Sequence, residues 1–307
     1  MNEPEIRVFC IGETVLDIIF SENQPVAARP GGSMLNSAVS LGRAGVHVDF
    51  ISALATDHAG DMVMDFLAEN HVSTSSILRY RERNTSLALA FLDKHRNADY
   101  SFYKVFPGVE EWFSPPATEP GDIILFGSFF AITERIRGPI LSFIRRARSS
   151  GALIIYDPNF RKSHLAELEK TRPMIIENIA LADLVRGSDE DFQYIFAANT
   201  AIEAYHHVEA AGCPTLIYTK NKEGVELICP GSHHVAKVPQ IDPVSTIGAG
   251  DAFNAGIIFA LQQENGNPSS FTWELILQTA VSFSENVCMR MDNYISPEFA
   301  STLRTKG

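Results

Sequence analysis

Segment 246–251, TIGAGD, opens a predicted helix and carries the strongest chemical signal in the chain. Gly248 and Gly250 allow neighbouring backbone N–H groups to turn toward one point, and a helix N-terminus favours an anion there. Asp251 stands at the mouth of this anion hole, where a carboxylate could take the proton of an attacking hydroxyl group, as phosphoryl transfer requires. The alternative is that the glycines form a turn and Asp251 only complements the helix dipole.

A glycine pair precedes a second predicted helix. Gly31 and Gly32 permit close approach of the backbone to a ligand, and Asn36 offers both a donor and an acceptor. Asp17, within an otherwise apolar stretch, is a carboxylate that could accept two hydroxyl hydrogen bonds, which suits a polyol. The alternatives are a turn before a helix with one inward polar residue, and a strand-edge aspartate that faces water.

Two familiar nucleotide-binding motifs are absent. Phe253 occupies the third-glycine position of a dinucleotide-binding GxGxxG, and this segment lies far from the first strand. No GxxxxGK occurs, which excludes a P-loop enzyme.

The elements that must position these residues alternate between strand and helix patterns. Strands are expected at 6–12, 46–54, 123–126, 153–156, 184–185 and 215–218, and helices at 33–45, 59–71, 135–148, 249–263 and 273–288. Such alternation implies a mostly parallel sheet with helices on both faces. Stretches 13–30 and 86–106 do not fit it and are expected to pair as a small second sheet. We therefore predict one α/β domain over residues 1–307.

Composition narrows the class of partner. The chain has 307 residues, a hydrophobic fraction of 45% and a net charge of −12, which argues against broad binding to nucleic acid or anionic membranes. No stretch approaches the roughly 20 apolar residues that span a bilayer, and the first apolar run is too short for a signal peptide. Four cysteines without a CxxC pair favour reduced, buried thiols. We expect a cytoplasmic protein.

Taken together, the two motifs resemble those of the ribokinase-like (PfkB) carbohydrate kinases, over about residues 6–290. The resemblance implies a three-layer α/β/α sandwich with a mostly parallel central sheet and a small β-sheet lid. It also implies phosphoryl transfer from ATP, with Mg²⁺, to a primary hydroxyl of a sugar. By the same resemblance Asp251 is the base, and the N–H groups of Gly248, Ala249 and Gly250 form the anion hole. The residues that would hold the sugar are Asp17, Gly31, Gly32 and Asn36.

Segment 157–161, DPNFR, resembles the DPNxR of bacterial fructokinases in this family. A strand that ends there places polar groups at the carboxyl edge of the sheet, where α/β proteins bind ligands. Arg161 is expected to steady a phosphate through its planar fork of donors; the alternative is a surface arginine after a turn. Phe102 belongs to an aromatic stretch beside the lid that would stack on substrate or mediate a homodimer through the lid, with simple packing equally open.

The nucleotide side departs from the family pattern. Where many members have the NxxE that organises magnesium, this chain has SDED, so Asp191 or Glu190 is expected near the metal. Asn221 replaces a glycine of TxGxxG, and asparagine tolerates a positive φ better than most residues. Ser245 replaces an aspartate that helps relatives bind a monovalent cation, and this argues against potassium activation. The residues expected at the nucleotide are Ser188, Thr219, Asn221, Gly224, Thr246 and Asn286.

The resulting expectation is a kinase that converts fructose to fructose 6-phosphate. Its rivals within the class are kinases of ribose, 2-keto-3-deoxygluconate and nucleosides. A different class of answer is a non-catalytic sugar-binding regulator on the same fold. Intact Asp251 and the glycine turn argue against that regulator, whereas the altered nucleotide loop favours it.

Overall fold

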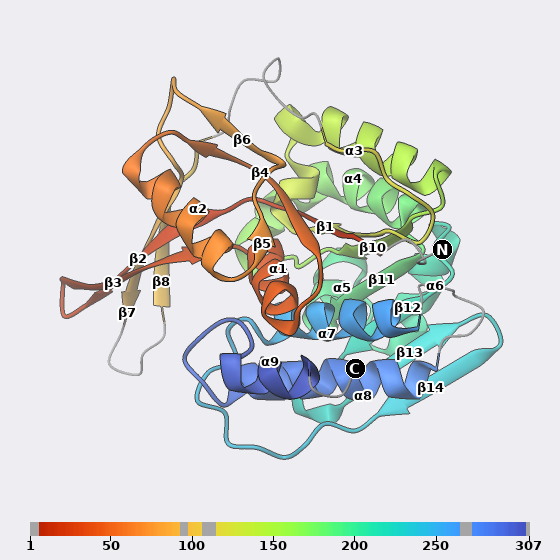
Figure 1. Cartoon of the computed structure of the whole chain (residues 1–307). Helices are drawn as coiled ribbons and strands as arrows, with labels where there is room; N and C mark the ends of the chain where they lie inside the picture. Colours follow the sequence, from red (N-terminus) through yellow and green to blue (C-terminus); the bar gives the residue numbers. More distant parts are fainter. Residues whose placement is uncertain (1–5, 93–97, 106–114, 265–271, 305–307) are drawn as a thin grey trace.

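The computed structural model describes residues 6–92, 98–105, 115–264 and 272–304. Among these residues the strands form two sheets: a large one through the centre of the molecule and a small one that projects from one side (Figure 1). The large sheet has the order β14-β13-β12-β11-β10-β9-β1-β4-β5, and β6 also pairs with β4. All pairs from β12 to β5 are parallel, whereas β13 and β14 extend one edge in antiparallel fashion, which confirms the predicted, mostly parallel sheet.

The central strands of this sheet are buried, whereas its edge strand β14 is largely exposed. The bounds of its strands are β1 Val8–Ile11, β4 Val48–Ala55, β5 Val72–Ser73, β6 Ile77–Tyr80, β9 Ile123–Gly127, β10 Leu153–Asp157, β11 Leu184–Ser188, β12 Leu216–Thr219, β13 Val225–Cys229 and β14 Ser232–Ala236. Side chains alternate between the two faces of a strand. In β1, Val8 and Cys10 therefore join one hydrophobic cluster, and Phe9 and Ile11 join the other.

Helices cover both faces and complete the three layers. Their bounds are α1 Ser33–Ala44, α2 His58–Glu69, α3 Glu134–Ser149, α4 Leu168–Leu181, α5 Asp189–Phe196, α6 Ala201–Ala210, α7 Ala249–Gln263, α8 Trp273–Cys288 and α9 Pro297–Arg304. The first cluster packs α1, α7 and α8 on one face, and the second packs α3, α4 and α6 on the other. Figure 1 shows α3 and α4 on the opposite side of the strands from α7 and α8.

The small sheet is the predicted lid. It contains β2 Val15–Ser21, β3 Gln24–Gly31, β7 Leu87–Leu92 and β8 Ala98–Tyr103, in the order β3-β2-β7-β8. The two stretches that broke the strand–helix alternation therefore pair, with β2 parallel to β7 and the other neighbours antiparallel. Phe20 and Phe91 stack across the central pair with ring centroids 4.9 Å apart.

Local chemistry explains where the helices nearest the site begin and end. Asp57 caps α2 by accepting the N–H of Gly60 at 2.8 Å, and it also accepts both the N–H and the hydroxyl of Thr85 at the root of the lid. Gly45 ends α1 with a φ of 89°, a left-handed conformation that glycine adopts without steric cost.

Within the described residues, no helix combines the length and the apolarity that crossing a membrane would need.

Candidate active site

A cavity of about 730 Å³ lies at the carboxyl edge of the large sheet. Three neighbouring strands end beside it, β10 at Asp157, β11 at Ser188 and β12 at Thr219, and α7 begins on its other side. Ligands of open α/β sheets bind at this edge. The predicted site residues that line the cavity are Arg161, Ser188, Glu190, Asp191, Thr219, Asn221, Thr246, Gly248, Ala249, Gly250 and Asp251.

The start of α7 has the geometry of an anion hole. N–H groups in the first turn of a helix have no acceptor inside the helix, and Gly248, Ala249 and Gly250 border the cavity here. Gly248 caps the helix with a φ of 82°, and a side chain on it would collide with the backbone of Asn293. Ala249 donates its N–H to the carbonyl of Thr246 at 3.3 Å, so its predicted part in the anion hole needs that long hydrogen bond to open.

Asp251 is buried at the wall of this cavity and is held by α1. Ser33 Oγ donates to its Oδ1 at 2.5 Å, and Asn36 Nδ2 donates to its Oδ2 at 2.8 Å. Burial raises the pKa of the Asp251 carboxyl, and these two hydrogen bonds oppose that rise because they favour the charged form. The two motifs identified from the sequence therefore meet in space.

The predicted sugar-holding residues lie on β2, on β3 and at the start of α1, and of these Asn36 contacts Asp251 directly. Gly32 precedes α1 with a φ of 141°, and a side chain there would lie 2.5 Å from the carbonyl oxygen of Glu13. Gly31 leaves room for the Asp17 carboxylate, which crosses the position that a side chain would take. Burial raises the pKa of Asp17 to about 6. Asp17 therefore comes from the lid and Asn36 from the body.

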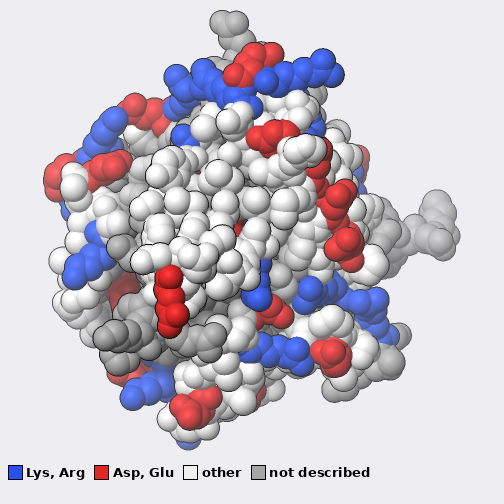
Figure 2. Space-filling view, turned by 90° about the vertical axis from the view of Figure 1, so that its left-hand side faces the viewer, with Lys and Arg blue, Asp and Glu red and all other residues white. Residues whose placement is uncertain are grey.

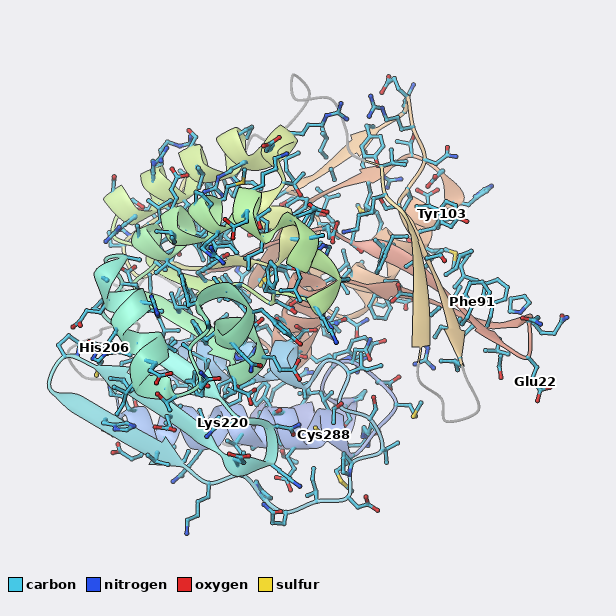
Figure 3. All side chains as sticks on the ribbon, turned by 180° about the vertical axis from the view of Figure 1, so that it is seen from behind. Glu22, Phe91, Tyr103, His206, Lys220 and Cys288 are labelled. Carbon is cyan, nitrogen blue, oxygen red and sulfur yellow. The ribbon has the colours of Figure 1, made fainter. Side chains whose placement is uncertain are left out.

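Two predicted substrate contacts have different settings. Arg161 lies on the cavity wall, and its positive charge lowers the pKa of Asp251. Phe102 lies on the lid with 56% of its surface exposed, and Lys104 Nζ lies 5.4 Å from its ring centroid. Figure 3 shows Tyr103 and Phe91 on the same projecting sheet, and Lys220 and Cys288 on the body. The contact of Phe102 with substrate stays a prediction.

Sequence reasoning missed a buried polar network beneath the anion hole. Asp157, fully buried, accepts hydrogen bonds from Arg186 Nη1 at 3.1 Å and from Asn254 Nδ2 at 2.6 Å. Arg186 Nη2 donates to Thr219 at 2.9 Å, and the guanidinium lies where a side chain at Gly250 would be. The available signal was an arginine inside an apolar strand, LVRGS, because a buried charge needs a partner.

A second missed residue is Ser33, which stands between this network and the base. Asn159 Nδ2 donates to Ser33 Oγ at 2.7 Å, and Asn159 N donates to Asp157 Oδ1 at 2.9 Å. No spacing in the sequence connects Ser33 with Asn159 and Asp251, because they come from three separate elements.

The nucleotide-side residues fall into two groups. Asn221 and Gly224 have φ values of 47° and 125°, so the turn survives the loss of its usual glycine through the tolerance of asparagine for this region. Asn286, by contrast, does not line the cavity: its Oδ1 accepts the N–H of Ser296 at 2.8 Å and anchors the C-terminal segment.

Both carboxylate oxygens of Asp191 accept hydrogen bonds from the protein. Its Oδ2 accepts the N–H and hydroxyl of Ser188 at 2.7 and 2.6 Å in a capping box, and its Oδ1 accepts the N–H of Phe160 at 2.6 Å. Burial raises its pKa to about 6. Glu190 is exposed on the cavity wall. In the described part of the chain, no three His, Cys, Asp or Glu side chains are grouped to bind a metal ion by themselves.

Comparison with known proteins places these features in context. The family model described as pfkB family carbohydrate kinase matches residues 5–281. Aminoimidazole riboside kinase of Salmonella typhimurium is 27% identical over 289 residues, which cover 93% of this chain and 88% of that protein. Fructokinase of Vibrio alginolyticus is 24% identical over 260 residues, with 84% of each chain covered.

Solved structures agree on the fold. Aminoimidazole riboside kinase from Salmonella enterica, complexed with aminoimidazole riboside and an ATP analogue, superposes with a TM-score of 0.84 at 22% identity, over 97% of this chain and 99% of that one. Fructokinase from Vibrio cholerae O395, bound to fructose, ADP and calcium, also gives 0.84, at 20% identity and over 98% and 99% of the two chains. The predicted ribokinase-like sandwich with its lid is confirmed.

Proposed function

The chain belongs to the pfkB family of carbohydrate kinases, and we propose that it transfers the γ-phosphoryl group of ATP to a primary hydroxyl of a sugar. One observation carries this proposal. Asp251, a buried carboxylate, stands in the first turn of α7 beside a glycine-capped helix N-terminus that borders a cavity of about 730 Å³. A base next to an anion site is what transfer of a phosphoryl group to a hydroxyl needs.

In the proposed reaction the sugar binds between the lid and α1, and ATP occupies the cavity. The hydroxyl oxygen attacks the γ-phosphorus, its proton passes to Asp251, and the bond from that phosphorus to the bridging oxygen breaks to release ADP. Gly248 and Gly250 direct their N–H groups at the phosphoryl oxygens while charge is shared among them. Arg161, on the same wall, adds a cation to the path of the phosphate.

Mg²⁺ fits the described residues as an ion that arrives with the nucleotide. Mg²⁺ at such sites is usually held by one or two carboxylates, water and substrate phosphates rather than by an all-protein cage. Glu190 offers an exposed carboxylate on the cavity wall, whereas Asp191 already accepts three hydrogen bonds. When bound, the ion would neutralise charge on the phosphate oxygens. We therefore propose Glu190 as the protein ligand.

Fructose is the proposed acceptor, with fructose 6-phosphate as the product. The fructokinases among the relatives, together with segment 157–161, support it. A riboside is the second candidate, because aminoimidazole riboside kinase is as similar to this chain as the fructokinases are. Both sugars present a primary hydroxyl, and their other hydroxyls could donate hydrogen bonds to the Asp17 carboxylate.

A coupled assay of ADP release tests the proposal. The acceptors are fructose, ribose, aminoimidazole riboside, 2-keto-3-deoxygluconate and a nucleoside, each with ATP and Mg²⁺. Turnover that is fastest with fructose supports the proposal in full. Faster turnover with a riboside would support the proposed kinase activity and contradict fructose as its acceptor. Sugar binding without turnover on any acceptor would favour the non-catalytic regulator.

We also propose that a second copy of the chain covers the lid. Four apolar side chains on the lid are well exposed: Val26, Phe91, Phe102 and Tyr103. Figure 2 views this side of the molecule, where uncharged side chains occupy a broad central area and charged ones lie mostly around it. Sedimentation of the wild type and of Phe102→Glu tests the arrangement: a dimer that the variant dissociates supports it, and a wild-type monomer contradicts it.

A further inference from the structure

Ser33 occupies a position from which a hydroxyl group reaches the catalytic carboxylate. It is the first residue of α1, partly buried, and its Oγ lies 2.5 Å from Asp251 Oδ1 and 2.7 Å from Asn159 Nδ2. The hydroxyl does not cap its own helix, because the N-cap residue is Gly32 and no side chain caps α1. Its two side-chain partners come instead from α7 and from the turn after β10.

The chemistry of the partners fixes the direction of both hydrogen bonds. An ionised carboxylate only accepts, so the Ser33 O–H must donate to Asp251. A serine hydroxyl has one proton, and therefore Asn159 must be the donor in its contact with Ser33. Asn159 is itself held by Asp157, through its main-chain N–H at 2.9 Å. The proton of Ser33 is thus directed at the base.

We infer that Ser33 is a positioning residue for the proposed reaction: its hydroxyl holds Oδ1 of Asp251 in place and keeps that carboxylate in its charged, proton-accepting form. The inference rests on the proposed function of Asp251. A carboxylate oxygen can accept two hydrogen bonds, so Oδ1 and Oδ2 each retain a site for the proton of the sugar hydroxyl. Ser33 and Asn36 therefore orient the base without blocking it.

Other groups around Asp251 set the background against which Ser33 acts. Burial and the negative charge of Asp157 on β10 raise the pKa of Asp251, and the positive charge of Arg161 lowers it. Arg186 on β11 packs against the neighbouring Gly250. The side chains of α1 that contact Asp251 are all uncharged. The one charged residue of α1, Arg43, lies at the other end of the helix and donates to the carbonyl of Ile295.

The chain offers a matched control one turn along the same helix. Ser37 Oγ donates to the main-chain carbonyl of Asp251 at 2.8 Å, so it contacts the same residue without contacting the carboxylate. Ser37→Ala and Ser33→Ala remove the same atoms from α1. A loss of packing alone would affect both variants, whereas an effect on the base requires the hydroxyl of Ser33.

The test is the pH dependence of kcat/KM together with the carboxyl titration of Asp251, followed by ¹³C NMR and assigned by its loss in Asp251→Asn. In Ser33→Ala we expect the acid limb of the kcat/KM profile and the titration of Asp251 to move to higher pH together, by about one unit. The free energy of a hydrogen bond to a charged group corresponds to a pKa shift of about that size or more. At pH values below the limb, kcat/KM should fall by about tenfold relative to the wild type. Ser33→Thr should restore the wild-type titration, and Ser37→Ala should leave it unchanged.

Two outcomes separate this inference from the proposed function. If wild-type protein phosphorylates no acceptor, the proposed function fails, and the NMR titration still reports on Ser33. If wild-type protein is active but Asp251 titrates at the same pH in Ser33→Ala, the inference is overturned and the kinase proposal stands. Should the alanine variant not fold, Ser33→Cys offers a weaker donor at the same place, and an Asp251 titration identical to wild type would equally overturn it.

Discussion

Replacement of Gly248 by alanine is expected to displace the N–H groups of the anion hole, because the new side chain would collide with the backbone of Asn293. Gly248 has a φ of 82°, a conformation that costs an L-residue about 1 to 2 kcal/mol. The new Cβ would also lie 2.7 Å from Cα of Asn293, about 0.7 Å closer than the 3.4 Å at which ordinary contacts begin. The Cβ is fixed to the backbone of residue 248 and its neighbours are main-chain atoms of Asn293, so one of the two segments must move. Such overpacking adds about 1 to 3 kcal/mol to the loss of stability.

Gly231→Ala is the matched control for this substitution. Gly231 has a φ of 78°, close to that of Gly248, but a Cβ there would meet no atom within 4 Å. It lies in the β13–β14 hairpin, away from the cavity lining. The control therefore contains the cost of the left-handed backbone and omits the collision with Asn293.

Urea denaturation and steady-state kinetics measure the two effects. We expect Gly231→Ala to lose about 1 kcal/mol of unfolding free energy and to keep wild-type turnover. Gly248→Ala should lose about 2 to 4 kcal/mol and, in the folded protein, at least about 100-fold in kcat, since one displaced anion-hole donor costs about that much. Equal stability losses in the two variants, or wild-type kcat in Gly248→Ala, would refute the reasoning.

Three further predictions follow from single residues. The pKa of Asp17 is raised to about 6 in the folded protein, so folding favours its protonated form; this stabilisation is complete below about pH 4 and is lost as the pH rises through about 6. Thermal unfolding should therefore show Asp17→Asn gaining about 1 kcal/mol over wild type at pH 7.5, after allowance for solvent screening, and little at pH 4. Asn221→Ala should lose about 1 kcal/mol at its φ of 47°, measured against Lys222→Ala in the same turn, which should stay near wild type. Arg161→Ala should lower kcat/KM for ATP-dependent turnover by tenfold or more while Arg161→Lys recovers part of it; equal activity of all three proteins would remove Arg161 from the phosphate path.

Local patterns were sufficient to predict the elements on which the base depends. The predicted helices 249–263 and 273–288 coincide with α7 and α8, because both are apolar segments too long to be strands. The two lid stretches were identified by their failure to fit the strand–helix alternation. The family resemblance assigned Asn36 to the sugar and Asp251 to proton transfer, and the structure joins these two side chains by a hydrogen bond of 2.8 Å.

Contacts between distant elements were beyond the reach of these patterns. Arg186 and Asp157 are paired across two neighbouring strands, and neither strand alone shows that the other supplies a counter-charge. Asn286 was predicted at the nucleotide, and no sequence pattern indicated the hydrogen bond that its Oδ1 accepts from the N–H of Ser296. Helix α4 received no predicted bounds, because Pro173 interrupts its interior and its apolar residues form a weak stripe.

The replacement of Asp251 by asparagine tests the central claim most directly. The amide keeps the size of the side chain and removes its ability to accept the hydroxyl proton. With ATP and the best acceptor from the screen, kcat should fall by about 10²- to 10⁴-fold while the sugar, measured by calorimetry, binds with an unchanged Kd. A variant that retained turnover within a few-fold of wild type would contradict the assignment of Asp251 as the base, and with it the account of this site.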